Sequence, residues 1–128
     1  MSRVRSRDTK PEMAVRQLVH SMGYRYRLSS KHLPYKPDLV FGPRKKAIFV
    51  HGCFWHQHPD PECKLARLPK SRLEFWVPKL QKNRERDEEA LRRLASLGWQ
   101  SLVVWECELR DMDKIRKRIT RFLTPESR

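Results

Sequence analysis

The sequence predicts one α/β domain, with helices and strands in the order αβββαβα. A length of 128 residues supports a single hydrophobic core but not two. Hydrophobic residues make up 38% of the chain and include four Trp, too many for a disordered chain. Apolar residues recur at helical spacing in three segments and in short β-type runs between them. No repeat or linker divides residues 1–128, so we expect a single domain throughout.

The first helix is predicted over residues 9–22. Thr9 and Glu12 have the spacing of a capping box, and Pro11 falls in the first turn, where its missing N–H is not needed. Gly23 is a typical helix stop. The apolar side chains that share one face of this helix are Ala14, Val15, Leu18, Val19 and Met22.

Three strands are predicted next. Residues 24–28 alternate aromatic and charged side chains, as a half-exposed strand does. Residues 37–41 and 46–50 are largely apolar and flank a Gly-Pro turn, so they predict a β-hairpin. The hairpin would place Asp38, at the start of its first arm, within side-chain reach of the segment around Val50.

The second half of the chain predicts a helix, a strand and a last helix. A second capping box at residues 71–74 opens a helix that runs to residue 97, bent or restarted at Pro78 and ended by Gly98. Residues 99–106 are rich in β-forming side chains. Asp111 opens a final helix, whose apolar stripe consists of Ile115, Ile119, Phe122 and Leu123.

Charge indicates the class of partner. The net charge is +14, and residues 1–46 have 12 Lys and Arg against three Asp and Glu, with Arg5 and Arg7 near the start. Such a segment attracts a polyanion and releases its counterions, which favours nucleic acid. A merely soluble basic protein, or attraction to a membrane surface, is the alternative. Apolar runs of four residues are far short of the roughly 20 that cross a bilayer, and no signal core is present, so we expect a cytoplasmic protein.

Three cysteines and one histidine have the chemistry of a metal site. Cys53, His58 and Cys63 are spaced five residues apart, and Cys107 follows the last predicted strand. A cytoplasmic chain rarely keeps disulfides, whereas three thiolates and an imidazole suit a structural Zn²⁺ ion. The alternative is three small buried hydrophobic residues beside a surface histidine.

A second group of residues suits phosphodiester hydrolysis. Asp38 and the segment with His51 and His56 would share one pocket, where the carboxylate can hold Mg²⁺ and an imidazole can take a proton from water. Glu12 on the first helix could orient one imidazole. Each residue alone has an ordinary explanation, since an Asp after Pro often forms a turn and a lone His is usually structural.

Large aromatic side chains lie beside basic residues. Phe54 and Trp55 fall inside the Cys/His loop, and Phe75 and Trp76 begin a basic helix. Aromatic side chains of DNA-binding proteins can wedge between base pairs. Core packing is the competing explanation, and we expect it for at least one of the four.

Several strings together resemble the very short patch repair (Vsr) endonucleases. They are HGCFWH at residues 51–56, Phe75-Trp76 with Asn83, Arg86 and Asp87 downstream, Gly98-Trp99, and VWEC at residues 104–107. The resemblance extends from about Arg7 to Cys107. It implies a restriction-endonuclease-like core, with a mixed central sheet flanked by helices. It also implies a nick in double-stranded DNA, 5′ of the thymine in a T·G mismatch left by deamination of 5-methylcytosine. We expect a monomer, with mismatch-repair proteins as candidate further partners.

The resemblance also implies roles for single residues. Asp38 and the main-chain carbonyl of Val50 match the magnesium site, His56 matches the general base, and His51 matches a phosphate contact. Glu12 matches the glutamate of the first helix. The wider fold places a second acidic residue and a lysine after the Asp, and this chain lacks both. The implied zinc ligands are Cys53, His58, Cys63 and Cys107, and the implied DNA contacts are Phe54, Trp55, Trp76, Asn83, Arg5 and Arg7.

This chain departs from the family pattern in two places. Residues 59–62 lengthen the gap between two of the zinc ligands, and the basic arm before the first helix is short. Two further classes of function stay open at this point: a zinc-stabilised DNA-binding module without hydrolytic activity, and a nuclease of the same fold with another substrate.

Overall fold

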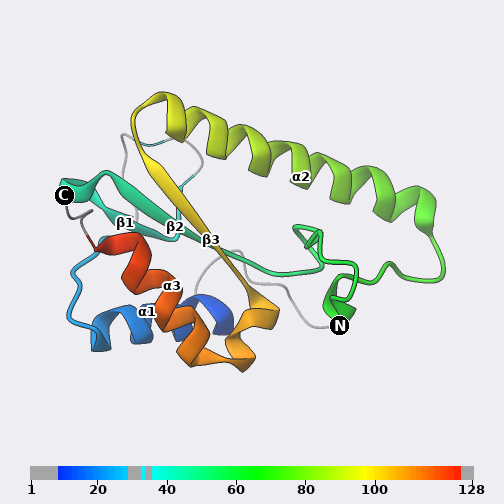
Figure 1. Cartoon of the computed structure of the whole chain (residues 1–128). Helices are drawn as coiled ribbons and strands as arrows, with labels where there is room; N and C mark the ends of the chain where they lie inside the picture. The colour runs from blue at the N-terminus through cyan, green and yellow to red at the C-terminus, as the bar shows by residue number, and fades with distance from the viewer. Residues whose placement is uncertain (1–8, 29–32, 34–35, 125–128) are drawn as a thin grey trace.

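The computed structural model describes residues 9–28, 33 and 36–124. A three-stranded sheet lies between two layers of helices, with α2 on one face and α1 and α3 on the other (Figure 1). The helices are α1 (Lys10–Ser21), α2 (Leu73–Ser96) and α3 (Met112–Leu123), and the strands are β1 (Leu39–Phe41), β2 (Lys46–His51) and β3 (Gln100–Trp105). Short 3₁₀ helices are η1 (Gly42–Arg44), η2 (Lys64–Ala66) and η3 (Glu106–Arg110).

The central strand β2 pairs with both neighbours. It is antiparallel to β1, with Leu39 opposite Ile48, and parallel to β3, with Val50 opposite Val104. The parallel pair requires a crossover connection, which α2 provides. This mixed sheet flanked by helices agrees with the predicted fold class.

Alternate residues of each strand face opposite layers. Phe49 packs in a cluster with Ala90 and Leu94 of α2. Its neighbours Ile48 and Val50 point the other way, into a larger cluster that also contains three buried residues from α1 and three from α3. The sheet therefore needs helices on both faces to bury its apolar side chains.

The predicted strand over residues 24–28 is wrong. Only Arg27 pairs, through two backbone hydrogen bonds with Val40 (2.9 and 2.7 Å). The edge that β1 offers is short, because the strand has three residues and the turn at Gly42 follows it directly. The described order is thus αββαβα, with a single bridge in place of the first strand.

Helix termini test the capping predictions. Thr9 caps α1 by accepting a hydrogen bond from the Glu12 N–H, as predicted. The second capping box does not form, because the N-cap of α2 is Arg72 in a left-handed conformation (φ 60°) without a side-chain cap. The helix also runs through Pro78 without restarting. Pro78 is near the start of the helix, so it removes one hydrogen bond where the helix has few to lose.

No helix in the described part of the chain is long and apolar enough to span a membrane.

Candidate active site

Asp38 is held at the edge of the sheet, immediately before β1. Its Oδ2 atom accepts a hydrogen bond from the Val50 N–H at 2.6 Å, one step beyond the paired positions of β1 and β2. Burial raises the pKa of Asp38 from 3.8 to about 6, and the nearby Glu12 carboxylate adds to this effect. The carboxylate therefore lies beside the Val50 peptide, as the predicted hairpin required.

His51 and His56 form a stacked pair at the end of β2. Their ring centroids are 3.9 Å apart and the rings are nearly parallel, at 5°. His51 is 6% exposed, and its buried Nδ1 atom has no hydrogen-bond partner among the described residues. Burial lowers the pKa of His51 to about 4, and the adjacent His56 contributes to the lowering. His51 is therefore a neutral imidazole near pH 7.

Asp87 completes this group, although the sequence did not reveal its role. Its Oδ2 atom lies 2.6 Å from Nδ1 of His56. Asn83, one helical turn earlier, donates a hydrogen bond to the Trp55 carbonyl at 3.0 Å. The spacing of four residues puts both side chains on one face of α2, which contacts the loop after β2. Asp87 was among the residues that carry the family resemblance, but no role was predicted for it.

One cavity joins these groups. It has a volume of about 500 Å³ and is lined by Glu12, Lys36, Asp38, Phe49, Val50, His51, His56, Arg86, Asp87 and Ala90. Glu12 is buried beside the cavity, where it accepts a hydrogen bond from Thr9 and forms an ion pair with Arg16 at 3.3 Å. The expectation that Glu12 orients an imidazole is wrong for His56, because Asp87 occupies that position.

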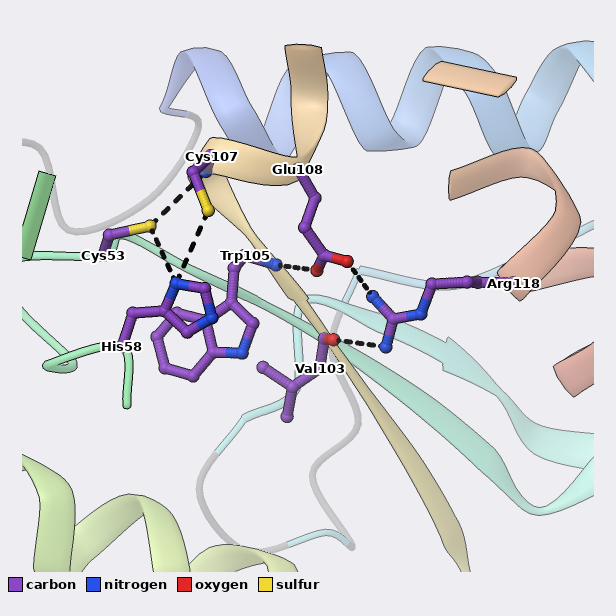
Figure 2. A network of polar contacts seen from close by, with 7 residues as sticks. All are labelled: Cys53, His58, Val103, Trp105, Cys107, Glu108 and Arg118. Atoms are coloured by element: carbon purple, nitrogen blue, oxygen red, sulfur yellow. Dashed lines mark hydrogen bonds and ion pairs between the residues drawn. The ribbon is translucent and has the colours of Figure 1, made fainter. Parts of the chain in front are cut away.

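The four residues Cys53, His58, Cys63 and Cys107, here called the Cys/His cluster, lie together. Their candidate ligand atoms are all within 4.8 Å of one another. Nδ1 of His58 is 3.8 Å from Sγ of Cys53 and 3.4 Å from Sγ of Cys107 (Figure 2). A tetrahedron with metal–sulfur bonds of about 2.3 Å has edges of roughly 3.7 Å. The donor set therefore fits a tetrahedral metal ion.

Local turns bring the four ligands together despite the longer loop. The N–H of Glu62 donates to Asp60 Oδ1 (2.9 Å) and the N–H of Cys63 donates to the Asp60 carbonyl (3.0 Å), which folds the extra residues into a turn. The N–H of Cys107 donates to Sγ of Cys53 at 3.4 Å. Burial raises the pKa of the Cys53 thiol to about 12 and also raises that of Cys107. Without a cation, these thiols therefore stay protonated.

Trp105 separates the Cys/His cluster from the stacked histidines. Its ring stacks on His58 (4.3 Å, 16°) and meets His51 edge-on (5.1 Å, 74°). The main-chain N–H of Trp105 donates a hydrogen bond to the Glu108 carboxylate at 2.9 Å. Arg118 of α3 binds both Glu108 and the Val103 carbonyl (Figure 2). The helix layer below the sheet thus fixes the end of β3 between the two sites.

The predicted aromatic residues form a separate group, the aromatic cluster, consisting of Phe54, Trp55, Phe75 and Trp76. Neighbouring rings meet at centroid distances of 5.0 to 5.8 Å, mostly edge-on. None of the four belongs to the two buried cores, and Phe75 is 45% exposed. The expectation that at least one of them only fills the core is therefore wrong. Arg5 and Arg7, the other predicted DNA contacts, lie outside the described residues.

Comparisons with known proteins place these features in one family. The family model described as DNA mismatch endonuclease Vsr matches residues 1–64. The type II nicking enzyme V.XorIIP of Xanthomonas oryzae pv. oryzae is 50% identical over 98% of this chain and 90% of its own length. The DNA mismatch endonuclease Vsr of Escherichia coli K12 is 42% identical over 90% of this chain and 72% of its own length.

A solved structure supports the fold. The catalytic domain of the homing endonuclease I-Bth0305I superposes with a TM-score of 0.61, covering 90% of this chain and 94% of that one. The two sequences are 23% identical, so this likeness concerns the arrangement of sheet and helices.

Proposed function

The chain belongs to the Vsr family of DNA endonucleases, and we propose that it nicks one strand of duplex DNA 5′ of the thymine in a T·G mismatch. Its proposed role is to start very short patch repair after deamination of 5-methylcytosine. The observation that carries the proposal is the group formed by Asp38, His51, His56 and Asp87 around one cavity. A DNA-binding module without activity would have no use for two half-buried carboxylates and paired imidazoles in one place.

Asp38 and the main-chain carbonyl of Val50 would hold the catalytic Mg²⁺. The donor set fits a hard cation, because a carboxylate and a carbonyl supply oxygen and the cavity has room for coordinated water. When bound, Mg²⁺ would neutralise charge on the phosphate and lower the pKa of a coordinated water. It would also favour the ionised form of Asp38, against the effect of burial.

His56 is the proposed general base. When its Nδ1–H donates to Asp87, the Nε2 atom carries the lone pair that accepts a proton from the attacking water. Asp87 also stabilises the imidazolium that results. His51 stacks on His56 and stays neutral near pH 7, so it is suited to a hydrogen bond with a phosphate oxygen rather than to an ion pair.

The Cys/His cluster is the proposed site of a structural Zn²⁺ ion. Three of its ligands come from the loop after β2, and Cys107 comes from η3, so a bound ion would tie that loop to the end of the sheet. Its four protein donors leave no open position for water, which separates it from the chemistry.

The aromatic cluster is the proposed reader of the mismatch. Its rings contact each other at the surface, next to the loop that carries His56, and they are not needed by either core. Inserting them between base pairs costs least where pairing is already weak, as at a T·G pair. Asn83 supports the Trp55 segment from α2, and Arg5 and Arg7 are proposed to bind backbone phosphates.

A nicking assay on end-labelled hairpin duplexes tests the proposal. One set carries T·G, matched T·A, matched C·G or other mismatches at the same position in identical flanks, each with and without Mg²⁺. We expect a single metal-dependent nick 5′ of the thymine in the T·G duplex and at least about 100-fold slower cleavage of the matched duplexes. Equal cleavage of all duplexes would indicate a nuclease of other specificity, and binding without cleavage would indicate a module without activity. Asp38→Asn protein is the control for contaminating nucleases.

A further inference from the structure

Carboxylates outnumber cationic side chains on the walls of the catalytic cavity. Three carboxylates line it, from Glu12, Asp38 and Asp87. Each has an assigned neighbour: Glu12 pairs with Arg16, Asp38 accepts the Val50 N–H, and Asp87 binds His56. A phosphodiester entering the cavity would be repelled by this group unless cations face it.

Two cationic side chains line the same cavity and are not used by the mechanism above. Lys36 lies on the segment that leads into β1, two residues before Asp38, and Arg86 lies on α2, directly before Asp87. Both residues are exposed. Neither forms a hydrogen bond or ion pair with any residue that the structure describes. Their charges therefore remain available for a ligand.

The backbone at Lys36 adds an independent observation. Its φ is 41°, in the left-handed region, and the next residue is the buried Pro37. A side chain in this conformation is disfavoured, and the position before proline is restricted as well. Glycine would adopt this conformation at lower cost. A lysine at this position places an ammonium group two residues before the proposed metal-binding Asp38.

The two cations lie on different walls of the site. Lys36 belongs to the wall that holds Asp38. Arg86 comes from α2, and it also lines an adjoining open groove along that helix, together with Lys82, Arg92, Glu85, Glu88 and Glu89. The glutamates of this groove balance its cations, so the charge of Arg86 is most useful to a phosphate at the cavity itself.

We propose that Lys36 and Arg86 form a phosphate clamp around the cavity, in which Lys36 binds the scissile phosphate and Arg86 binds a neighbouring phosphate of the cleaved strand. This inference rests on the proposed function and adds two substrate-binding residues to it. Lys36 takes the place of the lysine that the wider fold supplies after the Asp and that this chain lacks there. It stabilises the charge that grows on the non-bridging oxygens during attack, whereas Arg86 acts mainly on binding.

Single substitutions separate the two roles. Lys36→Met should lower the single-turnover nicking rate by about 100-fold and change the affinity for uncleaved duplex little, because it removes a contact that matters most in the transition state. Arg86→Met should weaken binding about tenfold and lower the slope of log affinity against log salt by about 1. Lys36→Arg should retain most of the rate.

A glycine substitution at position 36 separates the effect of the backbone conformation from the effect of the charge. Lys36→Gly should melt at the parent temperature or above, because the left-handed φ suits glycine, and should nick as slowly as Lys36→Met. Lys45→Met is the matched control, since Lys45 is also exposed and left-handed (φ 54°) but lies at the hairpin turn away from the cavity. Arg116→Met, on α3, controls for loss of an arginine.

Modified DNA then tests the contacts directly. Duplexes with one neutral methylphosphonate at a time near the nick should include one on which Arg86→Met has no further effect on binding. If the parent nicks T·G duplexes but both Met variants match the controls in rate, affinity and salt slope, the clamp is wrong and the proposed function stands. If the parent does not nick T·G duplexes but Arg86→Met still lowers the salt slope, the specificity is wrong and the clamp stands.

Discussion

The Cys/His cluster and the catalytic cavity both depend on the loop after β2, but they are built in opposite ways. In the Cys/His cluster the polar atoms face each other, and Cys53 is completely buried. In the cavity about 500 Å³ stays open, and desolvation displaces the pKa values of half-buried Asp38 and buried His51 in the direction of the uncharged form. The Cys/His cluster is complete once a metal ion binds. The charged forms of the cavity residues become favourable only when a metal ion and a substrate are bound.

Neighbouring residues of one loop therefore have different tasks: those of the Cys/His cluster stabilise the loop, and those of the cavity take part in the proposed chemistry. Four residues separate His51 from His56, and Cys53 is one of them. A metal ion on the Cys/His cluster would hold the loop in place, so that the histidines can be kept in a strained, partly desolvated position. Trp105 contacts one residue of each site and transmits this constraint.

Breaking the Cys/His cluster should have the largest effect. Cys107→Ser removes the ligand that ties the loop to β3, so the protein should lose bound zinc and unfold at temperatures where the parent is folded. Zinc content by mass spectrometry and thermal unfolding by circular dichroism measure both. Zinc-free parent protein with an unchanged melting temperature would contradict a structural metal.

Breaking the cavity should remove activity and leave the fold intact. Asp38→Asn should lower the nicking rate by more than about 1000-fold, because the loss of a catalytic metal removes several kcal/mol of transition-state stabilisation. In magnesium-free buffer it should bind mismatched DNA at least as well as the parent, since a negative charge is gone. Single-turnover kinetics and gel-shift titration test this, and residual cleavage above a thousandth of the parent rate argues against the role.

The interaction between His56 and Asp87 in the cavity should have the next largest effect on activity. Asp87→Ala should slow nicking by about 100-fold and change the pH–rate profile, because His56 loses the group that orients its ring and stabilises its charged form. Glu85→Ala, two residues earlier on the same helix, is the matched control. A rate and a profile equal to those of the control would mean that Asp87 only packs against the loop.

The carboxylate of Asp38, which the proposed reaction needs, should lower the free energy of unfolding at neutral and alkaline pH. Because the pKa of folded Asp38 is raised to about 6 from 3.8, the stability it contributes is present below pH 3.8 and is lost as the pH rises through 6. In magnesium-free buffer, Asp38→Asn should therefore be more stable than the parent at pH 8, by about 2 kcal/mol, and equal to it at pH 4. Chemical denaturation at both pH values measures the difference. Equal stability of the two proteins at pH 8 would show that the ionised Asp38 carboxylate does not destabilise the fold.

The aromatic cluster should give the smallest effect, limited to discrimination. Trp55→Ala and Trp76→Ala should reduce the preference for T·G over matched duplex about tenfold, since unstacking costs a few kcal/mol and only part of it differs between the two. Competition binding measures the preference, with zinc content and circular dichroism unchanged. If the preference persists in both folded variants, polar contacts must read the mismatch.

Local sequence patterns were sufficient for much of the fold. The capped first helix, the hairpin that brings Asp38 to Val50 and the last amphipathic helix depend on residues near one another in the chain, so spacing predicts them. The Cys/His cluster was also recognisable, because metal ligands must be of a few residue types. His51 and His56 were predicted from their chemistry and their closeness to the hairpin, and the structure places both beside the cavity that Asp38 lines.

Packing of the helices on the sheet decided the rest. Residues 24–28 have a strand pattern, but the short β1 edge accepts one residue. Asp87 reaches His56 from 31 positions away only because Ala90 and Leu94 seat α2 on the sheet. The roles proposed for Lys36 and Arg86 depend on the same contact, since they line one cavity from opposite elements. Local propensity is an interaction between near neighbours, whereas such a site exists only where apolar burial brings distant segments together.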